Sequence, residues 1–199
     1  MYFNEQAIIL SRQTFGEDDL LLKVYSAHHG KLILKARGAK KILSKLAGHL
    51  EPISLSYFNL VQGKNMLQII GAETVKSYVE IKNDLGKMDY VWPIVGLFNQ
   101  LILENHSDKR IFILLEKYLD FFNHKYQNNS DIYATAKLAV SFKLLDFLGL
   151  NPALKTNFSQ EINFIIKSSL TSIAKNQTIK NNFPTLKRIL DQEIKLHLH

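Results

Sequence analysis

A run of basic residues is the first feature of this sequence that suggests chemistry. Between positions 31 and 45 there are six lysines or arginines and no acidic residue. The six are Lys31, Lys35, Arg37, Lys40, Lys41 and Lys45. Because like charges repel one another, such a run costs stability unless an anion lies close by. The run therefore indicates a surface that binds an anionic partner.

The spacing of these cations indicates which kind of anion. In a strand over residues 31–38, the leucines and the alanine take the core face, and Lys31, Lys35 and Arg37 take the outer face. Residues two apart on one face lie ~6–7 Å from each other, which is near the spacing of phosphates along a nucleic-acid strand. Gly38 permits a sharp exit from the strand, after which the other three lysines extend the positive track.

Two further residues join the expected site. Arg12 belongs to a neighbouring strand, and Tyr57 has an aromatic ring able to stack on a base, as in many single-strand-binding barrels. The alternative is a solvated strand edge on which lysines discourage aggregation. One or two lysines fit that alternative well, whereas six without an intervening acid favour binding.

The composition describes a folded basic protein. Hydrophobic residues make up 46% of the chain, enough for a real core, and the net charge of +7 favours a polyanionic partner. There is no cysteine, which excludes disulfides and thiolate zinc sites and suits the cytoplasm. The first residues do not read as a signal peptide, and no apolar run is long enough to span a membrane, so a membrane association is not expected.

Catalytic motifs are missing from the sequence. It has neither a phosphate-binding loop of the Gly-x-x-x-x-Gly-Lys-Ser/Thr type nor a Gly-x-Ser-x-Gly elbow. Glu17, Asp18 and Asp19 are adjacent, so their carboxylates point in different directions and favour a solvated turn over a metal-dependent nuclease site. We therefore expect no enzyme, no catalytic residue, no metal site and no cofactor.

The first 75 residues have the pattern of a small β-barrel. Short runs rich in Val, Ile, Leu and Tyr alternate with turn signals, of which His28-His29-Gly30 is the clearest. The predicted strands cover Gln6–Thr14, Leu20–Ala27, Lys31–Gly38, Pro52–Leu60 and Met66–Val75. Five strands with a long loop after the third suit an OB-fold, although an SH3-like barrel fits the strand count nearly as well.

After residue 80 the apolar spacing becomes helical. Helices are predicted from Pro93 to Ile102, after Ser107-Asp108 to Phe122, from Ile132 to Leu148, and in shorter form at Gln160–Leu170 and Pro184–Leu198. The fold class is therefore α+β, an N-terminal five-stranded OB-fold barrel followed by a C-terminal helical bundle. We place the domains at residues 1–79 and 80–199, joined by a polar hinge around residues 77–84.

Several short motifs occur in a fixed order along the chain. They are Gly-Glu-Asp-Asp-Leu-Leu-Leu (16–22), His-Gly-Lys-Leu (29–32), Ala-Arg-Gly-Ala-Lys-Lys (36–41), Lys-Leu-Ala-Gly-His-Leu-Glu-Pro (45–52), Gly-Ala-Glu (71–73) and Lys-Leu-Leu-Asp-Phe-Leu-Gly-Leu-Asn-Pro (143–152). Together they resemble the RecO family of recombination mediators. The match is specific over the first 75 residues and weaker in the helical part.

The resemblance implies a function without bond-breaking catalysis. Such proteins bind single- and double-stranded DNA, anneal complementary strands, and work with RecR to load RecA onto strands covered by single-strand-binding protein. Some members also bind the acidic C-terminal tail of that protein through the helical domain. Arg37, Lys40, Lys41 and Lys45 fall on the basic motif of the family, and the resemblance implies that they contact DNA.

This chain departs from the family pattern in its helical part. Many members carry a four-cysteine zinc site after the helix that ends in Gly-x-x-Pro, but residues 154–164 have no cysteine, and the chain is shorter than most relatives. We therefore expect no zinc and a reduced C-terminal region. For a tail-binding surface we name Lys137, Phe142 and Lys143.

Two other functions remain open. One is an OB-fold that binds structured RNA, which a preference for RNA over DNA of equal length would reveal. The other is an interaction scaffold whose basic stretch receives an acidic partner protein. If the protein is the DNA-binding mediator that the resemblance implies, we expect a bacterial cytoplasmic protein that associates with the nucleoid when it binds DNA.

Overall fold

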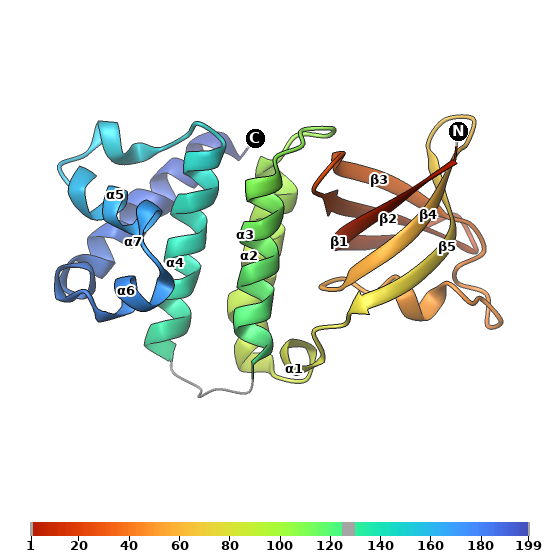
Figure 1. The fold of residues 1–199 in the computed structure, drawn as a ribbon, viewed down its shortest axis with the longest axis horizontal. Coiled ribbons are helices and arrows are strands. Elements are labelled where there is room, and N and C mark those ends of the chain that lie inside the picture. The colour runs from red at the N-terminus through yellow and green to blue at the C-terminus, as the bar shows by residue number, and fades with distance from the viewer. Residues whose placement is uncertain (1, 125–129, 199) are drawn as a thin grey trace.

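The computed structural model describes residues 2–124 and 130–198 of the chain. Its first part is a closed five-stranded barrel in the order β1-β2-β3-β5-β4 (Figure 1). The strands are β1 (Tyr2–Phe15), β2 (Asp19–Ser26), β3 (Gly30–Ala36), β4 (Leu55–Gln62) and β5 (Leu67–Lys76). Antiparallel pairing of β1 with β4 and parallel pairing of β3 with β5 complete the barrel. This is the topology of an OB-fold and not of an SH3-like barrel.

Alternation along the strands builds the barrel core. Leu32, Leu34 and Ala36 are all buried inside, as the period of two predicts. The long segment between β3 and β4 contains one short 3₁₀ helix, η1 (Ala47–His49). Leu50, directly after it, has no exposed surface and packs into the same core. The segment therefore covers one end of the barrel.

The second part of the chain is helical. The elements are α1 (Val79–Lys82), α2 (Leu85–Leu101), α3 (Lys109–Asn123), α4 (Ser130–Phe147), η2 (Pro152–Lys155), α5 (Ser159–Lys167), α6 (Leu170–Lys175) and α7 (Gln177–His197). In Figure 1 the pair α2 and α3 stands between the barrel and a layer formed by α4 to α7. Among the described helices, none is both long and apolar enough to cross a membrane.

Helix α2 begins earlier than the sequence pattern predicts. We expected Pro93 in the first turn, but the helix starts at Leu85, and Pro93 lies inside it. The reason is the cap, because the Asp84 carboxylate accepts a hydrogen bond from the Lys87 N–H at 3.1 Å. The short helix α6 was not predicted separately. It is capped by Ser169, whose hydroxyl accepts from the Ser172 N–H.

The prediction of a polar hinge at residues 77–84 is wrong. Tyr78 and Ile81 in this segment are buried. The Lys82 ammonium donates a hydrogen bond to the Ser54 hydroxyl at 2.7 Å, which ties α1 to the segment before β4. Lys76, at the end of β5, pairs with Glu116 and Asp120 of α3. The barrel is thus packed and bonded onto the helices.

A second core joins the barrel to the helices. It includes Ile8, Tyr25 and Ile53 from the barrel part and most apolar residues of α2 and α3. The Tyr25 hydroxyl accepts a hydrogen bond from the Asp108 N–H at 3.1 Å and donates to the Asp108 carbonyl at 3.2 Å. Burial raises the pKa of Tyr25 to about 12, so this hydroxyl stays protonated at neutral pH.

Candidate nucleic-acid interface

The basic run occupies the end of β3 and the loop that follows it. We call residues 37–46 the basic loop. It lies at the end of the barrel away from the helices (Figure 1). Its turns are closed by backbone hydrogen bonds from Lys41 N to the Gly38 carbonyl and from Ser44 N to the Lys41 carbonyl, at 3.1 and 2.9 Å. Gly38 has a φ of 61°, which glycine adopts without strain and which permits the turn out of β3.

Asp18 in the β1–β2 turn and Asp19 at the start of β2 lie against the basic loop. One Asp19 carboxylate oxygen accepts the Gly38 N–H at 2.8 Å, and the other lies 2.8 Å from the Lys35 ammonium. The hydrogen bond from Lys35 is the main cause that lowers the pKa of Asp19. The Asp18 carbonyl accepts the Lys40 N–H at 2.9 Å. The Asp19 carboxylate and the Asp18 backbone carbonyl thus hold the loop backbone in place.

The sequence prediction missed this role of Asp18 and Asp19. It treated both residues as solvated turn charges, yet they lie against the basic stretch in space. The signal was available in the hairpin register. Ser26 pairs with Gly30 and Leu20 with Ala36, so the residue before Leu20 lies across from the residue after Ala36. Counting back from the tight turn places Asp19 beside Arg37.

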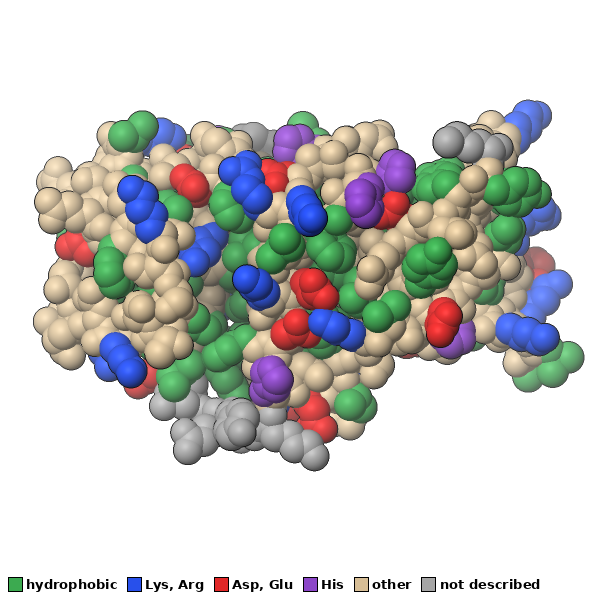
Figure 2. Space-filling model, in the orientation of Figure 1, with side chains coloured by type: hydrophobic (Ala, Val, Ile, Leu, Met, Phe, Trp, Pro, Cys, Tyr) green, Lys and Arg blue, Asp and Glu red, His purple; other side chains and the backbone are tan. Residues whose placement is uncertain are grey.

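Four cations of the basic loop are exposed to solvent. They are Arg37, Lys40, Lys41 and Lys45. Within residues 2–124 and 130–198, Lys41 alone of these four has an ion pair, at 3.6 Å from Asp18, and both side chains of that pair are at least half exposed. Figure 2 shows Lys and Arg side chains gathered at this end of the barrel, with hydrophobic side chains beside them. The loop therefore presents positive charge that, among the described residues, an acidic side chain pairs with only at Lys41.

Lys31 does not belong to this surface. We expected it on an exposed outer face, but it is only 8% exposed. Its ammonium donates a hydrogen bond to the Asn99 carbonyl of α2 at 2.8 Å, and burial lowers its pKa. The cause is that α2 and the following loop pack over the start of β3, where the Lys31 carbonyl also accepts the Asn105 N–H. Lys31 fastens the barrel to the helices.

Lys35 lies at the edge of the exposed set. Its ammonium is held by Asp19 and stands 4.8 Å from the centre of the Phe15 ring. Arg12 is exposed on β1, but it pairs with Glu51 at 2.6 Å. Tyr57 is 40% exposed on β4, and β5 separates that strand from β3. The structure thus brings the loop cations together and leaves Arg12 and Tyr57 apart from them.

The residues named for a tail-binding surface do not form one. The Phe142 side chain is completely buried among the helices, so it is a core residue. The Lys143 ammonium donates to the Ser168 carbonyl at 2.7 Å, and burial lowers its pKa. Lys137 is half-buried, and burial lowers its pKa as well. Phe142 and Lys143 thus join α4 to its neighbours.

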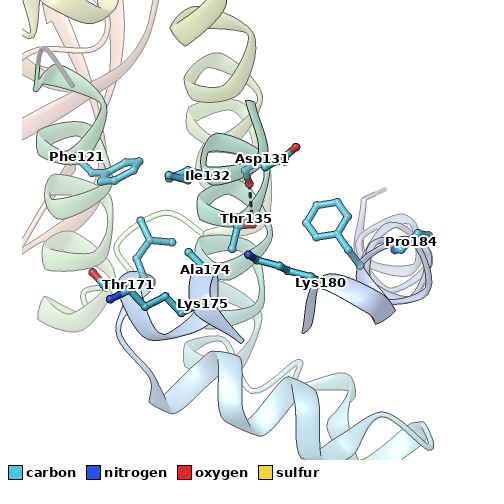
Figure 3. A pocket seen from close by; sticks show the side chains of 12 residues that line it. Phe121, Asp131, Ile132, Thr135, Thr171, Ala174, Lys175, Lys180 and Pro184 are labelled. Carbon is cyan, nitrogen blue, oxygen red and sulfur yellow. Dashed lines mark hydrogen bonds between the residues drawn. The ribbon is translucent and has the colours of Figure 1, made fainter. Parts of the chain in front are cut away.

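A separate pocket of about 810 Å³ lies among α3, α4, α6 and α7 (Figure 3). Apolar side chains dominate its lining, including Phe121, Leu170 and Phe183. Lys175 and Lys180 also line it, and so does Asp131. The pocket therefore combines an apolar interior with lysine side chains.

Comparison with known proteins finds relatives in one family. Residues 1–78 match the family model described as "Recombination protein O N terminal". A protein named DNA repair protein RecO from Desulforamulus reducens is 33% identical over 153 residues, which cover 77% of this chain and 57% of that protein. RecO of Alkaliphilus metalliredigens is 25% identical over 77% of this chain and 61% of its own length. RecO of Acetivibrio thermocellus is 28% identical over 57% of this chain and 45% of its own length.

The chain spans about half the length of the curated relatives it matches. The matches extend beyond the barrel into the helices, because one alignment covers 154 residues. The observed barrel agrees with the OB-fold that the resemblance implied. The chain is therefore similar to the RecO family, over its barrel and into its helices.

Proposed function

We propose that this protein is a DNA-binding recombination mediator that anneals complementary strands. The observation that carries the proposal is the basic loop, an ordered segment whose four exposed cations are almost unpaired. Electrostatic attraction to phosphates supplies most of the affinity of such a surface. Nothing on the loop reads base edges, so we expect little sequence preference.

The proposed mechanism is charge neutralisation. The exposed cations engage the phosphates of two strands at once and so lower the repulsion between the strands. Complementary bases then meet more often, which speeds annealing. Because Lys35 is already paired with Asp19, its contribution should be smaller than that of Lys40 or Lys41.

Annealing of two fluorescently labelled complementary oligonucleotides tests this proposal. The test variant combines Arg37→Ala, Lys40→Ala and Lys41→Ala. A control variant removes the same charge from exposed lysines of the helical part, Lys109, Lys167 and Lys195. We expect wild type and control to accelerate annealing and the loop variant to lose the acceleration.

Two results would overturn the proposal. If the loop variant anneals as fast as wild type, the DNA-binding surface lies elsewhere on the chain. If wild type itself does not accelerate annealing, an interaction scaffold that receives an acidic protein becomes the better reading. An RNA competitor of equal length that displaces the DNA more effectively would instead favour the RNA-binding function.

The partners are also part of the proposal. We propose RecR as the direct partner, with RecA loaded onto the strand as the consequence, since the family resemblance implies both. For the acidic tail of single-strand-binding protein we propose the pocket among α3, α4, α6 and α7, because its apolar lining and its lysines suit a peptide with both acidic and apolar residues. This site replaces Lys137, Phe142 and Lys143.

Anisotropy of a fluorescent peptide with the tail sequence tests the pocket. Lys175→Glu with Lys180→Glu should weaken peptide binding at least tenfold and leave strand annealing unchanged. Equal binding by wild type and the double variant would show that the tail, if it binds, uses another surface.

A further inference from the structure

The tip of the basic loop exposes two adjacent apolar side chains. Ile42 is 101% and Leu43 is 92% exposed, so neither has appreciable contact with the rest of the protein. Single exposed apolar residues are common on protein surfaces and need no explanation. Two neighbouring ones, between Lys41 and Lys45 and fully in solvent, are a different feature. Annealing by charge neutralisation alone does not require them.

The loop places this pair outside by its geometry. Ile42 and Leu43 are the two central residues of the turn that the Ser44 N–H closes onto the Lys41 carbonyl, and the turn closed by the Lys41 N–H comes directly before it. Ala39 before it is 1% exposed, and Leu46 after it packs against the barrel core. The loop therefore buries its flanking apolar residues and presents only the pair at its tip.

We propose that Ile42 and Leu43 bind the faces of unpaired bases while the flanking lysines hold the adjacent phosphates. The occupant of this tip must be apolar at its centre and anionic around it, because the tip is apolar and its rim is cationic. Single-stranded DNA offers both, whereas a duplex conceals its base faces. Apolar side chains that insert between bases are an established mode of DNA binding, and contacts with base faces do not depend on sequence.

This inference rests on the proposed function and deepens it. It names the substrate class as strands with unpaired bases, such as single strands and junctions between single strand and duplex. Insertion of the pair would open the stack of a bound strand and so expose its bases for pairing with a complement. The lysines would then supply affinity for any DNA, and the apolar pair a preference for unpaired DNA.

The test compares two double variants. The first is Ile42→Ser with Leu43→Ser. The control is Leu154→Ser with Leu196→Ser, which makes the same change at exposed leucines of the helical part. All four side chains lie largely in solvent, and circular dichroism and thermal unfolding verify that each variant keeps the wild-type fold. The probes are a single-stranded oligonucleotide that contains 2-aminopurine, whose fluorescence rises when its base unstacks, and a duplex of equal length.

We expect wild type and control to raise 2-aminopurine fluorescence on binding. The loop variant should lose this rise and bind the single strand about tenfold more weakly, equivalent to about 1.4 kcal/mol. Its duplex affinity should stay within about twofold of wild type, and its salt dependence should be unchanged because no charge is removed.

Three outcomes would overturn the inference. A loop variant that raises the fluorescence like wild type shows that the pair does not contact bases, while the proposed DNA binding stands. Equal losses of single-strand and duplex affinity show that the pair supports the loop rather than selecting unpaired DNA. If wild type binds neither oligonucleotide but binds vesicles of anionic phospholipid, both the inference and the proposed function fail.

Discussion

Replacing Lys31 with methionine should weaken the attachment of the barrel to the helices without weakening DNA binding. The Lys31 ammonium donates to the Asn99 carbonyl at 2.8 Å, and the residue is 8% exposed. A hydrogen bond from a charged donor contributes about 1.5–3 kcal/mol. Methionine keeps most of the apolar stem but leaves the carbonyl without this donor. Because removing a buried charge also recovers part of its desolvation cost, we expect the lower end of that range, about 1.5 kcal/mol.

In a chain of this length, each kcal/mol lowers the melting temperature by about 2–4 °C, so Lys31→Met should melt about 3–6 °C below wild type. The assay is thermal unfolding followed by circular dichroism, together with the salt dependence of binding to a single-stranded oligonucleotide. The exposed Lys40→Ala variant is the control and should behave in the opposite way, with unchanged melting and a weaker salt dependence. The reasoning would be refuted if Lys31→Met melted like wild type and its salt dependence were reduced.

Three further substitutions test other parts of the structure. Gly30→Ala should unfold the protein or lower its melting temperature steeply, because a Cβ there would collide with the backbone of the α2–α3 loop. Gly16 is the control, because it has a similar positive φ but a Cβ there would meet open space. Gly16→Ala should therefore lower the free energy of unfolding by only about 1 kcal/mol in urea titrations. Phe142→Ala should destabilise the protein by about 3–5 kcal/mol through a buried cavity; a fully stable variant would show that the residue is not in the core. The hydrogen bond from Lys155 chiefly lowers the pKa of Glu193 below 4.5, so its stabilisation is present at neutral pH and is lost as the pH falls through that lowered pKa. Lys155→Ala should therefore be less stable than wild type at pH 7 but equally stable once the pH has fallen below that lowered pKa, and a difference that persisted in stronger acid would contradict this account.

Much of the fold was predictable because local patterns decide it. The alternation through Leu32, Leu34 and Ala36 fixed the inner face of β3. Asp108 caps α3 through its side chain, as the Ser107-Asp108 signal indicated. The start of α2 at Leu85 was not predicted, because proline is favoured in the first turn of a helix and Pro93 therefore indicated a later start. Residues 77–84 are mostly polar, and this composition did not indicate that Tyr78 is buried.

The candidate site was predicted only in part, because some of its features depend on residues that are distant in the sequence. Exposure of Arg37, Lys40 and Lys41 follows from their place in a loop after a strand. The burial of Lys31 depends on α2, whose Asn99 is 68 residues away in the sequence. No local pattern reports such a contact. The contact of Asp19 with the basic loop is intermediate in sequence range, since the register of the β2–β3 hairpin alone places Asp19 beside Arg37.

The most direct test of the central claim is the salt dependence of single-strand binding. If Arg37, Lys40, Lys41 and Lys45 each engage a phosphate, the dissociation constant should follow salt with a log–log slope of about 2.8 in magnitude, at about 0.7 per contact. We predict that replacing all four with alanine reduces the slope to near zero, while the control that removes charge from Lys109, Lys167 and Lys195 keeps it. An unchanged slope in the fourfold variant would contradict the assignment of the basic loop as the DNA-binding surface.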